Sequence, residues 1–66
     1  MESLGEALPK EQSRVREVLG YYRELGEAGV FAEKQIKRSL EKADSAIIGG
    51  DIIEMMTAYK ELQEIK

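Results

Sequence analysis

The fold of this 66-residue chain is decided by a short break between two apolar runs, Ile47-Ile48-Gly49-Gly50-Asp51-Ile52-Ile53-Glu54. Two adjacent glycines end a helix well, because glycine readily adopts the left-handed conformation that follows a last helical turn. Asp51 then accepts backbone N–H groups as an N-cap, and Glu54 three residues later completes an acidic variant of the capping box. We therefore expect two helices joined at residues 49–51 in a helical hairpin.

Outward from this break, apolar residues at spacings of three and four predict helices over residues 9–25, 30–48 and 52–65. Gly26 ends the first helix, and Pro9 suits its first turn. The predicted inward stripes are Val15, Val18, Leu19, Tyr22 and Leu25, then Ile36, Leu40, Ala43 and Ile47, then some of Ile52, Met55, Met56, Tyr59, Leu62 and Ile65. Because strict strand alternation is absent and the turns are short, we predict an all-α, three-helix up-down-up arrangement in which helices 2 and 3 form the hairpin.

Residues 1–8 are predicted to be a leader, partly disordered, outside a single helical domain of residues 9–66. Gly5 and Pro9 oppose a long helix there. Leu4 and Leu8 have two alternatives, docking on the bundle or fraying with the leader. The first helix also has two alternatives, since it can pack on its own chain or reach a second subunit.

The composition excludes several classes of chemistry. The chain has no Cys and no His, which rules out nucleophilic catalysis through Cys or a Ser–His pair and argues against a structural zinc site. We therefore expect no enzyme, no cofactor and no metal. The net charge of −3 argues against nucleic acid as a partner. Because the first residues lack a signal peptide and the apolar runs are too short to span a bilayer, we expect a cytoplasmic protein without a membrane partner.

The small size of the chain favours self-association. For so short a chain, apolar burial at about 25 cal/mol per Å² and ordering entropy of about 1.5 kcal/mol per residue nearly cancel. The sequence also holds more apolar residues than one inward stripe per helix can cover. We therefore predict a homodimer that forms a larger helical bundle. The candidate interface residues are Tyr21, Tyr22, Phe31, Met55, Met56 and Tyr59.

A basic face lies on the second predicted helix. Its residues are Lys34, Lys37, Arg38 and Lys42. The preferred interpretation is a solvated face that partly matches an acidic stripe of Glu17, Tyr21 and Glu24 on the first helix. The next is a docking surface for an acidic protein partner. The third is nucleic-acid contact in a helix-turn-helix arrangement, although Val30–Glu33 supplies no base-reading side chain at the start of the helix.

Two stretches of the chain carry a resemblance. The first is Leu8-Pro-Lys-Glu-Gln-Ser-Arg-Val-Arg-Glu-Val-Leu-Gly-Tyr-Tyr-Arg-Glu-Leu-Gly. The second comprises Ala43-Asp44, Gly50-Asp51 and Ala58-Tyr59-Lys60-Glu61-Leu62. Over positions 8 to 66 the chain thus resembles a group of small, uncharacterised helical proteins of phages and prophages. This resemblance implies a phage-borne accessory or regulatory protein and carries no functional motif.

These patterns together predict a non-enzymatic interaction or adaptor protein that acts through helical surfaces as a homodimer. The alternative is a nucleic-acid-associated regulator that uses the basic face of the second helix.

Overall fold

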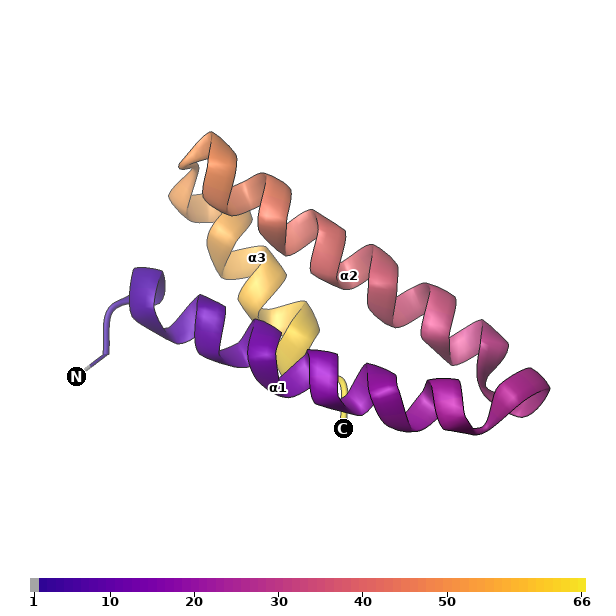
Figure 1. Cartoon of the computed structure of the whole chain (residues 1–66). Helices are drawn as coiled ribbons and strands as arrows, with labels where there is room; N and C mark the ends of the chain where they lie inside the picture. The colour runs from indigo at the N-terminus through magenta and orange to yellow at the C-terminus, as the bar shows by residue number, and fades with distance from the viewer. Residues whose placement is uncertain (1) are drawn as a thin grey trace.

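Three α-helices and one 3₁₀ turn make up the structure: α1 (Leu4–Glu24), η1 (Gly26–Gly29), α2 (Val30–Gly49) and α3 (Ile52–Gln63). In this computed structural model, which describes residues 2–66, 88% of the chain is helix and none is strand. The predicted all-α fold with three helices is confirmed. The helices run up, down and up, and α3 packs against both other helices (Figure 1).

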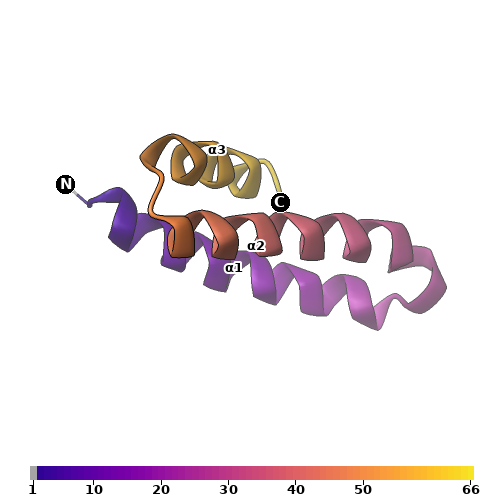
Figure 2. The same cartoon turned by 90° about the horizontal axis from the view of Figure 1, so that it is seen from above.

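α1 and α2 form a long antiparallel hairpin, and α3 lies across one part of it (Figures 1 and 2). At a rise of about 1.5 Å per residue, α1 and α2 are each about 30 Å long, whereas α3 is about 18 Å long. α3 contacts the first half of α1 and the second half of α2, and the α1–α2 turn extends beyond it. Because α1 packs on α2 and α3 of its own chain, the structure shows the first of the two alternatives for this helix.

The core is small and lies where all three helices meet. Its buried residues are Leu8, Val15, Leu19, Ile36, Leu40, Ala43, Ala46, Ala58 and Leu62, with Val18, Tyr22, Met55, Tyr59 and Ile65 partly buried around them. Most of the predicted stripe residues are therefore inside. Leu25, Ile47, Ile52 and Met56 differ, since each remains exposed.

The predicted start of the first helix requires correction. α1 begins at Leu4, five residues before the predicted start, and Leu8 is completely buried. Pro9 lies inside the helix, where it cannot donate to the Gly5 carbonyl. Gly5 and Pro9 lie on the exposed side of the helix, so water can bind the Gly5 carbonyl. The burial of Leu8 favours the additional helical turn. Residues 4–8 thus belong to the domain, while the prediction for Met1 lies outside the described residues.

The local signals at the helix ends act as predicted. Gly26 and Gly50 both have left-handed backbone angles, with φ of 63° and 69°. Asp51 Oδ1 accepts hydrogen bonds from the backbone N–H groups of Ile53 (2.9 Å) and Glu54 (3.4 Å), which confirms it as the N-cap of α3. α2 ends at Gly49 and α3 at Gln63, within two residues of the predicted ends.

Candidate interaction surfaces

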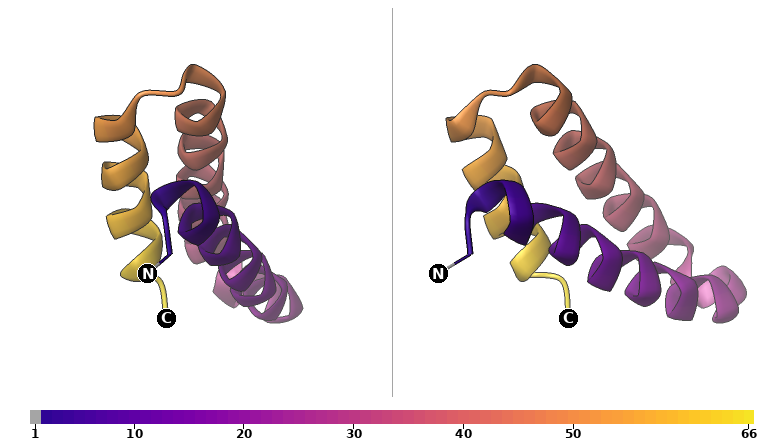
Figure 3. Two further views of the ribbon diagram at one scale, coloured as in Figure 1. Left: turned by 90° about the vertical axis from the view of Figure 1, so that its left-hand side faces the viewer. Right: turned by 60° about the vertical axis from the view of Figure 1, so that its left-hand side comes forward.

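Nine large apolar side chains are exposed among residues 2–66, as many as there are buried apolar residues in the core. They are Tyr21, Leu25, Val30, Phe31, Ile47, Ile48, Ile52, Ile53 and Met56. The first four flank the α1–α2 turn, and the other five flank the α2–α3 turn. Figure 3 shows that these two turns lie at opposite ends of the molecule. The uncovered apolar surface is therefore divided between two regions.

The six candidate interface residues do not form one surface. Tyr22, Met55 and Tyr59 are partly buried against the core of their own chain. Tyr21 and Phe31 are 67% and 76% exposed at the α1–α2 turn. Met56 is exposed on α3, in the other region.

An apolar cleft lies between the start of α1 and the outer side of α3. It has a volume of about 530 Å³. Its apolar lining comprises Leu4, Ala7, Ile52, Met56 and Tyr59, and its polar lining comprises Glu2, Lys60 and Gln63. The structure thus brings two predicted interface residues, Met56 and Tyr59, together in one cleft. Leu4 in the α1 wall and the buried Leu8 follow the first of their two predicted alternatives, docking on the bundle, and the leader predicted for residues 1–8 is wrong over residues 4–8.

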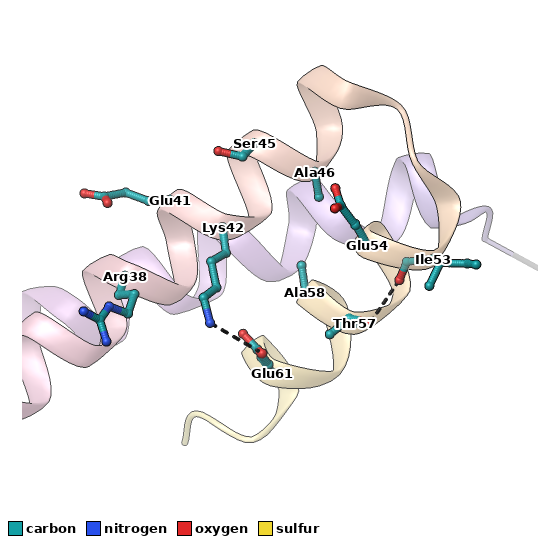
Figure 4. Close-up of a pocket in the computed structure, with 10 residues that line it drawn as sticks. All are labelled: Arg38, Glu41, Lys42, Ser45, Ala46, Ile53, Glu54, Thr57, Ala58 and Glu61. Atoms are coloured by element: carbon teal, nitrogen blue, oxygen red, sulfur yellow. Dashed lines mark hydrogen bonds and ion pairs between the residues drawn. The ribbon is translucent and has the colours of Figure 1, made fainter.

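A second groove, with a volume of about 510 Å³, lies between α2 and α3. Figure 4 shows its lining, in which Ala46 and Ala58 lie between charged side chains of the two helices. Lys42 Nζ and Glu61 Oε1 form an ion pair across the groove at 3.9 Å. Arg38 lines the same groove near Glu61 but has no ion pair within residues 2–66. This groove is more polar than the first, because Glu41, Glu54 and Glu61 line it together with Arg38 and Lys42.

The basic face is exposed along its whole length, but nearby carboxylates neutralise part of it. Lys37 pairs with Glu33 at 3.6 Å, and Lys42 pairs with Glu61. Glu33 also accepts a hydrogen bond from Arg23 Nε of α1 at 3.1 Å. Within residues 2–66 the partners are therefore Glu33 and Glu61, and the acidic stripe predicted on the first helix supplies none of them; a match to that stripe on a second subunit stays a prediction.

A polar cluster attaches the end of α3 to the middle of α1. Arg14 donates two hydrogen bonds to the Glu11 carboxylate, at 2.9 and 3.0 Å, and a third to the Leu62 carbonyl at 2.9 Å. The bonds from Arg14 hold the pKa of Glu11 below its ordinary value of 4.5. The Leu62 carbonyl therefore accepts hydrogen bonds both from Arg14 and from the Ile65 N–H (3.1 Å), and the Arg14 bond joins the end of α3 to α1.

Gln12 makes a second polar contact that sequence reasoning missed. Its side chain is buried, and its Nε2 donates to Asp44 Oδ1 of α2 at 2.7 Å. Arg16 lies 3.8 Å from the same carboxylate. A buried amide that is paired in this way fixes the register of α1 on α2 at little net cost.

Over residues 2–66, no group of acidic side chains is arranged to hold a metal ion, and no helix has the length and apolar character needed to cross a membrane. No family model, curated protein or solved structure matches this chain. The resemblance to small phage proteins therefore stays a prediction. The cleft, the groove and the exposed apolar side chains are the features of this chain that bear on its function.

Proposed function

We propose that this chain is a non-enzymatic interaction or adaptor protein that acts through its helical surfaces as a homodimer. The supporting observation is its exposed surface. The chain exposes 4801 Å², whereas a compact monomer of 7.4 kDa is expected to expose about 4200 Å². The excess of about 600 Å² approaches the roughly 800 Å² that each partner buries in an interface of standard size.

The apolar cleft between α1 and α3 is the best surface for the second copy. Ile52 lines the cleft and is 60% exposed, and Ile53 lies beside it on the exposed crest of α3, where it is 75% exposed. A ridge beside a groove complements itself under a two-fold axis, because each copy can place its ridge in the groove of the other. The charged residues of the two walls are Glu2, which pairs with Lys10 of its own chain, and Lys60 on α3.

Sedimentation velocity over a range of concentrations tests the homodimer. We expect the mass to rise from 7.4 kDa to about twice that value at micromolar concentrations. Met56→Glu places a charge in the cleft and should return the protein to a monomer. Ile48→Glu is the matched control, because Ile48 is 87% exposed and does not line the cleft. A monomer at every concentration, or equal loss of dimer in both variants, would overturn this interface.

The absence of cysteine offers an independent test of the interface. Ile53→Cys introduces a single thiol on the crest of α3, which should form a disulfide-linked dimer under mild oxidation. Phe31→Cys, at the far end of the molecule, is the control and should remain largely uncrosslinked. Efficient crosslinking through position 31 alone would place the dimer at the other end.

A further inference from the structure

The third helix is too short to cover the hairpin on which it packs. Arg14 of α1 and Lys42 of α2 meet the last turn of α3, and the two helices continue past them for about ten and twelve residues, or about 15 and 18 Å. Figures 1 and 2 show this uncovered part of the hairpin leading to the α1–α2 turn. Tyr21, Leu25 and Phe31 are all more than half exposed there.

The face of α1 that meets α3 continues into this uncovered part. Arg14, whose side chain binds the Leu62 carbonyl, marks that face. At 100° per residue, Val18, Tyr21 and Leu25 follow Arg14 on the same side of the helix. Val18 is partly buried against the core, and the stripe then runs past the end of α3 through the exposed Tyr21 and Leu25.

The face of α2 that meets α3 continues in the same way. Lys42, which pairs with Glu61, marks it. Arg38 and Phe31 lie four and eleven residues before Lys42, within about 40° of it around the helix. Figure 4 shows Arg38 beside the Lys42–Glu61 pair with no acidic partner of its own.

We propose that this surface, defined as the tip surface (Val18, Tyr21, Leu25, Phe31 and Arg38), binds an amphipathic helix of another protein. The bound helix follows α3 end to end, with its apolar side chains on the α1 residues and an acidic edge toward Arg38. The inference rests on the proposed interaction function but not on the homodimer, which uses the opposite end of the molecule.

The packing of α3 shows what such a helix requires. Leu62 is completely buried beneath it, and Glu61 lies on the α2 side, where it meets Lys42. Lys60 lies on the α1 side, where it lines the cleft with Glu2. A helix that binds farther along the hairpin with the same arrangement, an acidic side toward α2 and a basic side toward α1, would place a carboxylate near Arg38. It would place a cation near the exposed Glu17 and Glu24 of α1.

Charge disfavours several other occupants. A two-fold pairing with antiparallel hairpins would bring the basic faces of both α2 helices together, which is repulsive. A two-fold axis along the helices would instead place α2 of one copy opposite α1 of the other, and the dilution measurement below distinguishes that outcome. Nucleic acid would meet Glu17 and Glu24 along one edge and apolar side chains at the centre. A helix with one acidic edge satisfies both the apolar stripe and the free guanidinium.

Two synthetic peptides of about 20 residues, longer than the roughly 12–15 residues below which an isolated helix is marginal in water, test the proposal. Both carry leucines at helical spacing. One has Glu along the edge that would face α2, and the other has Lys there. Titrated into the full chain and followed by backbone amide NMR, the Glu peptide should bind at least tenfold more tightly than the Lys peptide. The shifted resonances should lie between Val18 and Arg38.

Variants locate the contact. Leu25→Glu should abolish binding of the Glu peptide, and Arg38→Glu should weaken it about tenfold while strengthening binding of the Lys peptide. Lys10→Glu makes the same type of charge change near the start of α1, away from the tip surface, and should alter neither. Circular dichroism of each variant confirms that the helices remain.

The outcomes separate this inference from the proposed function. Equal affinity for the two peptides, no binding of either, or shifts confined to α3 would overturn the inference even if the protein sediments as a dimer. Shifts at Tyr21 and Phe31 on dilution alone would assign the tip surface to a second copy. Tighter binding of a duplex oligonucleotide to the same residues would assign it to nucleic acid. Selective binding of the Glu peptide by a monomeric protein would support the inference and reject the homodimer.

Discussion

Replacing Leu8 with alanine tests whether the start of α1 is part of the folded domain. Leu8 is completely buried in the core, together with Val15 and Leu62. Removing a buried leucine side chain beyond Cβ costs about 2–5 kcal/mol, because both apolar burial and close packing are lost. A 66-residue chain has a total stability of only about 3–10 kcal/mol, at roughly 0.05–0.15 kcal/mol per residue. Leu8→Ala should therefore remove a large fraction of the free energy of unfolding.

Thermal unfolding followed by circular dichroism measures this loss. For a domain of this size each kcal/mol corresponds to about 4–8 °C, so a loss of about 3 kcal/mol lowers Tm by about 12–24 °C. Leu62→Ala is the positive control, because Leu62 is equally buried. Leu25→Ala is the negative control, since Leu25 is 58% exposed and should change the stability by less than about 0.5 kcal/mol. If Leu8→Ala behaved like Leu25→Ala, residues 4–8 would be a frayed leader and the packing of α1 described above would be wrong.

Two further substitutions test the hairpin and the attachment of α3. A Cβ at Gly29 would lie 2.2 Å from the Tyr22 carbonyl oxygen, so Gly29→Ala should lower the stability by about 1–3 kcal/mol. Gly20→Ala meets no atom within 4 Å and should raise it by about 0.5–1 kcal/mol; equal shifts in Tm would contradict this contrast. The folded-state pKa of Glu11 is lowered by Arg14, so its stabilisation exists above the unfolded pKa and disappears as the pH falls through the folded value. The Tm difference between wild type and Glu11→Gln should therefore shrink as the pH falls from neutral to well below 4.5, and a constant difference would contradict it.

The helix breaks were predictable because they depend on interactions within a few residues. Gly50 adopts a left-handed conformation and Asp51 accepts the first N–H groups of α3 wherever the rest of the chain lies. The start of α1 was not predictable from the same signals. Pro9 and Gly5 oppose a helix locally, and only the burial of Leu8 between the other helices outweighs that preference.

The candidate surfaces were predictable in part. Periodicity placed Tyr22 inward and Tyr21 outward on the first helix, and the structure agrees. It could not show that Met55 and Tyr59 contact their own core while Met56 lines a cleft with Leu4. Those outcomes depend on which helix lies opposite each stripe.

The sequence by itself determined that this chain is helical, where its second and third helices begin and end, and which stripes are apolar, because capping and periodicity act over one or two turns. Only the tertiary structure decided which parts of those stripes are covered. α3 is much shorter than α1 and α2, so it covers part of the hairpin and leaves the tip surface exposed. Burial depends on the length over which two helices are in contact. Neither the spacing of apolar residues nor the composition of the chain specifies that length.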